Sequence, residues 1–215
     1  MKFSLFGFPV QAHWTFFLVA LFLAGNLGRP TYILVGACII FVSVLAHELG
    51  HALVARRFGM QPQILLHTFG GMTYWGSPQS LRPAQRLGIT LAGPFAGFLL
   101  AAIMLALPKP SPQEPILYIA RATALWVNIA WGILNLLPVL PLDGGHALAE
   151  ILTLATGRPQ RLMVLRISIV TALALAVFAL SRGMIYGGVL AGLMAYSNFA
   201  ALRQLNDPFT RGGWR

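Results

Sequence analysis

At residues 47–51 the chain reads His47-Glu48-Leu49-Gly50-His51, inside a run of apolar residues where ionisable side chains are costly. If this run is helical, His47 and His51 lie one turn apart on the same face and can both reach one metal ion. Glu48 then lies close to the same ion. Two neutral imidazoles that hold a metal, with a glutamate as the base, are the chemistry of the HExxH pattern. The stretch therefore predicts a metal site with a basic glutamate beside it.

The residues on both sides predict that this stretch lies in a transmembrane helix. Residues 32–46 and 52–55 are almost wholly apolar, and the next charges are Arg56 and Arg57. A helix of about 20 to 25 such residues crosses a bilayer. Glu48 lies eight residues before Arg56, about 12 Å along a helix axis. We therefore expect the metal site nearer the Arg56 end of the span than its middle.

The composition indicates an integral membrane protein. Of the 215 residues, 57% are hydrophobic and only 9% are charged, which is too apolar for a soluble domain of this size. The net charge of +10 does not indicate a nucleic-acid partner, because the basic residues lie in short connections between apolar runs. The single cysteine, Cys38, excludes an internal disulfide and a cysteine-based metal site, and we expect it to be packed against other side chains.

The apolar runs predict an all-α polytopic membrane protein of about six transmembrane helices. A single membrane-embedded domain, residues 1–215, would hold a core of about residues 31–146. The first run is short enough to resemble a signal-peptide core, but it lacks a compact basic start, so we expect a helix there. After the second run, residues 64–75 are β-prone and interrupted by Gly70-Gly71, which predicts a β-hairpin or an extended segment. The runs cover about residues 14–25, 31–57, 87–107, 116–140, 162–180 and 184–202.

The distribution of Lys and Arg predicts the orientation in the membrane. Successive loops lie on alternate sides of the membrane. The loops on one side contain Arg29, Lys109 and Arg182, and Arg121 is left unassigned near the start of a helix. By the positive-inside tendency, we expect both termini and the loop after the metal-binding helix in the cytoplasm of a cell-membrane protein. The more basic side receives the other eleven: Lys2, Arg56, Arg57, Arg82, Arg86, Arg158, Arg161, Arg166, Arg203, Arg211 and Arg215.

A catalytic zinc site needs a third protein ligand, with the fourth position kept for water. The chain has only five acidic residues, and Asp143 is the one that falls at the same predicted end of the membrane as His47 and His51. An equally good interpretation of residues 141–145 is a simple turn, since Pro, Asp and Gly are turn residues. The other histidines have weaker claims, and we expect His13, His67 and His146 to be structural or interfacial.

The paired signatures resemble the site-2 protease family of intramembrane zinc metalloproteases. HELGH at residues 47–51 matches HExxH, and NLLPVLPLDGG at residues 135–145 matches the NxxPxxPxDG segment of that family. The resemblance extends to Gly70-Gly71 and to residues 92–94, Ala-Gly-Pro, so it covers most of residues 41–145. Gly97 departs from the asparagine that many members carry there. The PDZ and CBS domains of many relatives are absent from the sequence, so the chain resembles a compact form.

The resemblance implies a zinc endopeptidase that cuts within or near transmembrane segments of membrane proteins. His47, His51 and Asp143 would bind one zinc ion per chain, and Glu48 would be the general base. Asn135 would donate a hydrogen bond to the substrate backbone or the oxyanion, although bonding to a neighbouring helix is equally possible for it. The expected partners are transmembrane substrates and the lipid bilayer.

Two other functions fit parts of the sequence. A zinc-binding transporter also places metal ligands inside helices, but it would have ligands at several depths, and acidic residues are nearly absent from the other spans. A non-catalytic binding protein is disfavoured because both histidines and the base are intact. The sequence does not identify the substrate, a regulatory partner or the oligomeric state.

Overall fold

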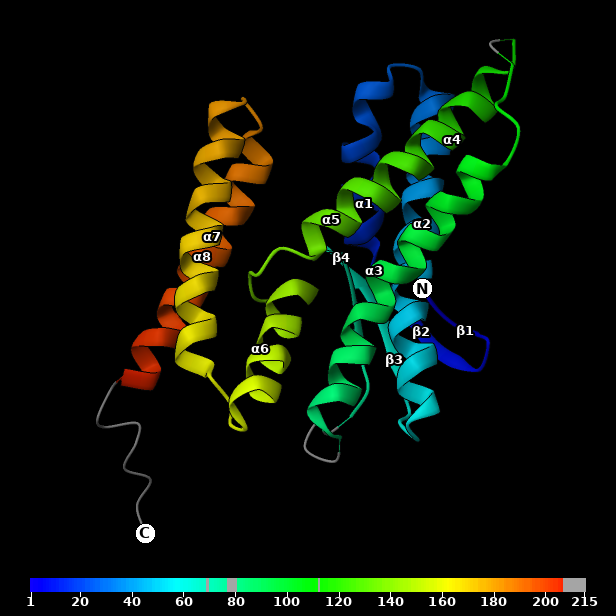
Figure 1. Ribbon diagram of the computed structural model, residues 1–215. Coiled ribbons are helices and arrows are strands. Elements are labelled where there is room, and N and C mark those ends of the chain that lie inside the picture. The colour runs from blue at the N-terminus through cyan, green and yellow to red at the C-terminus, as the bar shows by residue number, and fades with distance from the viewer. Residues whose placement is uncertain (69, 77–80, 112, 207–215) are drawn as a thin grey trace. The chain divides into compact units, whose positions relative to one another are not determined.

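The computed structural model describes residues 1–68, 70–76, 81–111 and 113–206, in two compact units (Figure 1). The first unit is Met1–Leu134 and the second is Asn135–Arg215. Helices dominate both units, and a small sheet belongs to the first. This composition confirms the predicted class of an all-α polytopic membrane protein with a small β element.

Proline starts the three long helical segments of the first unit. Pro30, Pro83 and Pro115 each occupy the first helical position, where a missing N–H costs nothing and the fixed φ suits the helix. The third segment contains a π-helical turn, η3, between α4 and α5. The helices of this unit are α1 (Trp14–Ala24), the 3-10 turn η1 (Gly25–Leu27), α2 (Pro30–Arg57), α3 (Pro83–Ala106), α4 (Pro115–Trp126), η3 (Val127–Trp131) and α5 (Gly132–Asn135), whose last residue opens the second unit.

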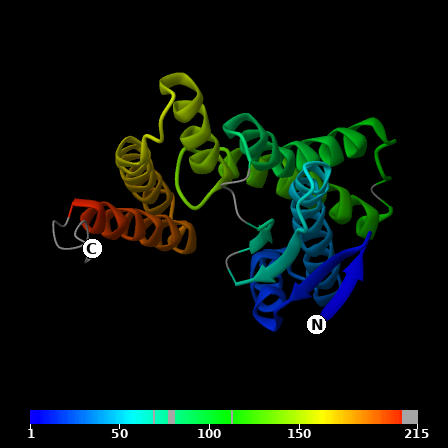
Figure 2. The same ribbon diagram turned by 90° about the horizontal axis from the view of Figure 1, so that it is seen from below.

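The sheet has four strands in the order β1-β2-β3-β4. The strands are β1 (Lys2–Leu5), β2 (Phe8–Ala12), β3 (Gln63–His67) and β4 (Gly70–Tyr74). β3 and β4 pair antiparallel, which confirms the hairpin predicted for residues 64–75, of which residue 69 lies outside the described residues. β1 and β2 also pair antiparallel, and β2 joins the hairpin by pairing parallel to β3 (Figure 2).

The two amino-terminal strands were not predicted, because residues 1–12 are too short to show a clear pattern by themselves. Their place is fixed by contacts with α2. The guanidinium of Arg56 donates a hydrogen bond of 2.9 Å to the carbonyl oxygen of Phe6 and lies 4.3 Å from the centroid of the Phe8 ring. The start of the chain and the end of α2 therefore lie side by side.

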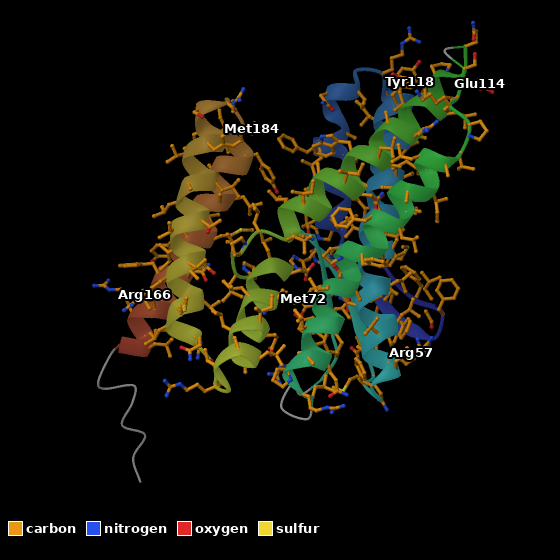
Figure 3. All side chains as sticks on the ribbon, viewed as in Figure 1. Arg57, Met72, Glu114, Tyr118, Arg166 and Met184 are labelled. Atoms are coloured by element: carbon orange, nitrogen blue, oxygen red, sulfur yellow. The ribbon has the colours of Figure 1, made fainter. Side chains whose placement is uncertain are left out.

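Five helical segments are long and apolar enough to cross a membrane, and a sixth is shorter. The sixth, Trp14–Leu27, is the first predicted run; β2 ends before it at Ala12, and Gly28 follows it with a positive φ. Figure 3 shows Arg57, at the end of α2, and Glu114, after α3, at opposite ends of the first unit, as the single crossing by α3 between them requires. The five segments are Pro30–Arg57, Pro83–Ala106, Pro115–Asn135, Arg161–Ser181 and Ile185–Leu205.

One stripe of α2 is buried, and it carries Glu48 and His51 of the HExxH motif. Cys38 lies off this stripe and is exposed, so the expectation that it packs inside the protein is wrong. The residues of this stripe recur at intervals of three or four positions, which is the spacing of one face of a helix. The buried residues include Gly36, Ile40, Val44, Glu48, His51, Ala52 and Ala55.

The second unit contains a helical pair and a shorter helix. α7 (Arg161–Ser181) and α8 (Ile185–Asn206) pack on each other through alanines such as Ala172 and Ala195, which allow close approach. The predicted run of residues 116–140 ends as helix at Asn135, because Pro138 and Pro141 break it. The chain then re-enters a helix that was not predicted, α6 (Asp143–Thr156).

Candidate metal centre

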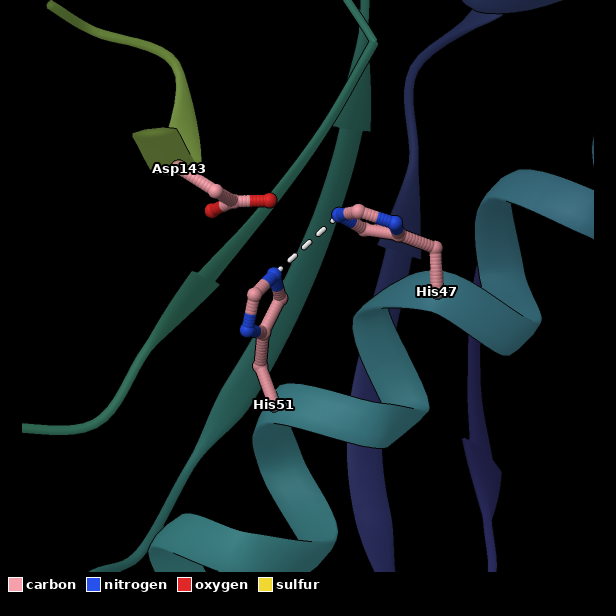
Figure 4. A group of neighbouring side chains, drawn as sticks. All are labelled: His47, His51 and Asp143. Carbon is pink, nitrogen blue, oxygen red and sulfur yellow. Dashed lines mark hydrogen bonds between the residues drawn. The ribbon is translucent and has the colours of Figure 1, made fainter. Parts of the chain in front are cut away.

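His47 and His51 lie on consecutive turns of α2 with their imidazoles facing the same point (Figure 4). Their Nε2 atoms are 3.1 Å apart and the two rings meet edge to face, at 80°. Two ligands of a tetrahedral zinc ion, at about 2.0 to 2.1 Å from the metal, are separated by about 3.3 Å. The spacing of the two nitrogens therefore matches that of two ligands on one ion.

The backbone of α3 fixes which nitrogen of His51 is available to a metal. Nδ1 of His51 lies 2.7 Å from the carbonyl oxygen of Ile89. A carbonyl only accepts, so Nδ1 must carry the proton and Nε2 keeps its lone pair. Such a partner behind the ring is what orients a metal-binding histidine.

Gly93 of α3 leaves the room that the two imidazoles occupy. A β-carbon at this position would overlap the ring of His51 and would lie 2.7 Å from Nε2 of His47. The same helices also touch at Gly50, where a β-carbon would overlap the carbonyl oxygen of Ala92. Small residues thus bring the backbone of α3 against the two histidines and leave no room there for a further side chain.

Glu48 is held between α2 and strand β4. Only 4% of its surface is exposed, and a β-carbon on Gly71 would overlap its side chain. The hydroxyl of Thr73 lies 2.6 Å from Oε2 of Glu48, to which it donates, and 3.1 Å from the backbone carbonyl oxygen of the same residue. The carboxylate of Glu48, the residue that follows His47, therefore lies against β4 with one oxygen bonded to the sheet.

Asp143 belongs to the second unit and is the first residue of α6, where the helix dipole favours a negative charge. Two glycines follow it because the preceding loop folds back on the first turn. A β-carbon on Gly144 would overlap the carbonyl of Leu136, and one on Gly145 would lie 2.5 Å from the backbone nitrogen of Leu140. The Asp-Gly-Gly sequence is thus a helix start under a tight loop, and not the isolated turn that the sequence also allowed.

Two buried side chains of the helical pair hold this loop. The backbone N–H of Leu140 donates to Oγ of Ser168 at 3.1 Å, and Nδ2 of Asn198 donates to the carbonyl oxygen of Leu140 at 2.7 Å. Ser168 is fully buried and Asn198 is 3% exposed. α7 and α8 therefore fix the backbone that leads into Asp143.

The other residues considered from the sequence are Asn135 and three further histidines, which lie on different elements. Asn135 is the last residue of α5, and His146 is exposed in the first turn of α6. His13 caps α1, with Nδ1 accepting from the backbone N–H of Thr15, which agrees with a structural role. His67 ends strand β3 opposite Gly70.

Several polar residues that support the site were missed in the sequence. Thr73 is an ordinary residue of a β-prone segment, and nothing local marks it. Asn128 lies in the π-helical turn η3, is 4% exposed, and donates to Oγ of Ser43 at 2.9 Å, one turn before His47. A buried polar residue in an apolar run was the one available signal for Ser168, Asn198 and Asn128.

The fold and these residues define a polytopic membrane protein with a histidine metal site in an apolar helix. Comparison with known proteins identifies the family. The family model described as Peptidase family M50 matches residues 35–113 and 109–179. A solved structure, the site-2 protease from Methanocaldococcus jannaschii, superimposes with a TM-score of 0.63 at 27% identity, over 94% of each chain.

Curated relatives agree with this assignment. Rip3 of Mycobacterium tuberculosis, whose name describes it as a candidate zinc metalloprotease, is 34% identical over 221 residues, 92% of this chain and 56% of its own. The zinc metalloprotease MJ0392 of Methanocaldococcus jannaschii is 32% identical over 158 residues, 70% of this chain and 44% of its own. The chain thus spans about half the length of these relatives. It belongs to Peptidase family M50, and the resemblance to site-2 proteases is confirmed.

Proposed function

We propose that the chain is an intramembrane zinc endopeptidase that hydrolyses peptide bonds within or near transmembrane segments of membrane proteins. The observation that carries this proposal is the pair of Nε2 atoms of His47 and His51, 3.1 Å apart on an apolar helix that also carries Glu48. Membership of a peptidase family whose relatives are named as zinc metalloproteases supports it. Substrates could be single-pass proteins in regulated proteolysis or remnants of signal peptides.

The residues fit one zinc ion per chain. His47 and His51 would bind it through Nε2, and Asp143 would supply the third ligand, a role that rests on its match to the family segment and on carboxylate chemistry. When bound, zinc lowers the pKa of water and polarises a carbonyl group. Glu48 takes a proton from the attacking water and passes it to the departing amine. Asn135 donates a hydrogen bond to the substrate backbone or the oxyanion.

A substrate helix must unwind before its backbone can be attacked, because its peptide groups are bonded to each other. Within the described residues, β4 is at the edge of the sheet, and Gly71 and Thr73 of this strand contact Glu48. An unwound segment could therefore pair with β4 and lie beside the base. This adds a role for the hairpin to the proposed activity.

The proposal also covers the membrane location, the orientation and the partners of the protein. Residues 1–215 would act as one membrane-embedded domain whose core is about residues 31–146. We place it in the cell membrane, with both termini and the loops near the site on the cytoplasmic side, from the excess of Lys and Arg there. Transmembrane substrates and the lipid bilayer are the partners, without nucleic acid.

A zinc transporter is the weaker alternative. Conduction would need ligands at several depths of the membrane. Among the residues that the structure describes, no group of three or more potential ligands gathers away from His47 and His51. The site therefore favours chemistry at one place over passage through the protein.

The test compares purified wild type with Glu48→Gln on a panel of tagged single-pass substrates, with zinc content measured in both. We expect cleavage by wild type only, at equal zinc content, and loss of cleavage on chelation that zinc restores. Glu114→Gln, a glutamate before α4, is the matched control and should cleave normally. Cleavage by Glu48→Gln at the rate of wild type would refute the proposed role of the base.

A further inference from the structure

We propose that Thr73 is the positioning residue of the base: its hydroxyl holds Oε2 of Glu48 and leaves Oε1 to accept the proton of the attacking water. This inference deepens the proposed function and rests on it. It concerns a residue outside both sequence signatures, on a strand 25 residues further along the chain.

The contact is specific in its geometry. The distance of 2.6 Å between Oγ1 of Thr73 and Oε2 of Glu48 is that of a charge-assisted hydrogen bond, which is about twice as strong as a neutral one. The hydroxyl has one proton, and the carboxylate oxygen is its nearer acceptor, compared with 3.1 Å to the carbonyl oxygen of Glu48. A carboxylate held in this way is already oriented before the reaction, so the entropy cost of orienting it does not add to the barrier.

The alternation of side chains along β4 determines which of its residues can contact Glu48. Side chains alternate along a strand, so Gly71 and Thr73 share one face and Met72 and Tyr74 share the other. The first face contacts Glu48, with Gly71 making room for the side chain and Thr73 bonding to it. Met72 and Tyr74 are 40% and 53% exposed. One strand therefore both presents an edge to the substrate and orients the base.

The decisive variants are Thr73→Val, which keeps the shape and removes the hydroxyl, and Thr73→Ser, which keeps the hydroxyl. We expect Thr73→Val to lower kcat on the order of tenfold to a hundredfold, as for other partners behind an active-site group, with KM within about twofold of wild type. Zinc content should stay at the wild-type level. Thr73→Ser should restore most of kcat. Thr153→Val removes a hydroxyl that bonds only to Ala149 within α6 and should cleave normally.

A second measurement does not depend on cleavage. The chain has three glutamates, Glu48, Glu114 and Glu150, so in protein labelled with ¹³C at the glutamate carboxyl the signal of Glu48 is assigned by its loss in Glu48→Gln. We expect Thr73→Val to shift this signal and Thr73→Ser to return it toward wild type.

The outcomes separate the two proposals. If wild type cleaves and Thr73→Val cleaves equally fast, or if Val and Ser are equally impaired, Thr73 does not position the base. Loss of zinc in step with kcat would also overturn the inference, because it would indicate a structural role. If wild type cleaves nothing, the proposed function fails, and the ¹³C signal alone decides whether Thr73 holds Glu48.

Discussion

Gly93 of α3 lies so close to His51 of α2 that a β-carbon on the glycine would overlap Nε2 of the imidazole. One turn before Gly93, the carbonyl oxygen of Ile89 accepts the hydrogen bond from Nδ1 of the same ring, at 2.7 Å. α3 thus accepts a hydrogen bond from Nδ1 of His51 and leaves no room for a side chain at residue 93 beside Nε2. The histidine pair is shaped by a neighbouring helix as much as by its own.

Gly93→Ala should weaken zinc binding. The added methyl group would lie within van der Waals overlap of His51 and 2.7 Å from Nε2 of His47, so one ring must turn away. We expect zinc affinity to fall on the order of tenfold to a hundredfold, measured by competition with a chelator of known affinity. Gly88→Ala is the control on the same helix, because nothing lies within 4 Å of its β-carbon. Equal affinity in both variants would contradict the packing described for Gly93.

Gly144→Ala should disturb the start of α6. A β-carbon there would overlap the carbonyl of Leu136, so the loop before Asp143 must move. If Asp143 is the third ligand, zinc content after purification should fall and cleavage with it. Gly192→Ala on α8 has open space around the new methyl and serves as the control. Full zinc occupancy in Gly144→Ala would argue against the proposed role of Asp143.

Asn198→Ala should destabilise the second unit. It removes the donor to the carbonyl oxygen of Leu140 and leaves that oxygen without this bond. Hydrogen bonds between helices in a membrane contribute about 0.6 to 2 kcal/mol, so we expect a lower Tm in detergent. The adjacent Ser197→Ala removes only an exposed bond to Met194 and should keep the Tm of wild type. A Tm equal to wild type in Asn198→Ala would show that α8 does not anchor the loop.

Met72→Pro should reduce cleavage without loss of zinc. Proline removes the backbone N–H from β4 and restricts φ, which disfavours a paired strand at the proposed substrate edge. Met72→Thr keeps the N–H and a β-prone side chain, and we expect near-normal cleavage from it. Both variants are assayed for cleavage and zinc content. Normal cleavage by Met72→Pro would remove the support for pairing of the substrate with β4.

The sequence predicted the parts of this protein that depend on neighbouring residues. His47 and His51 are four apart, so the helical repeat alone places them on one face. The apolar runs predicted the membrane helices because hydrophobic length is a local property. The hairpin of residues 64–75 was recognised from its β-prone residues and its central glycines, whereas β1 and β2 were not, since they are strands only through pairing with β3 and contact with Arg56.

Tertiary structure decided what surrounds the motif. The bonds of Thr73 to Glu48, Ile89 to His51 and Asn198 to Leu140 join residues 25, 38 and 58 positions apart. No periodicity relates such residues, because their approach depends on how helices and strands pack. α6 follows the same rule, since its Asp-Gly-Gly start reads locally as a turn and becomes a helix start only under the loop of residues 136–142. The sequence by itself determined the spacing of His47 and His51 on one face of an apolar helix, because both depend on neighbouring residues, and long-range packing decided how Glu48 and the histidines are held.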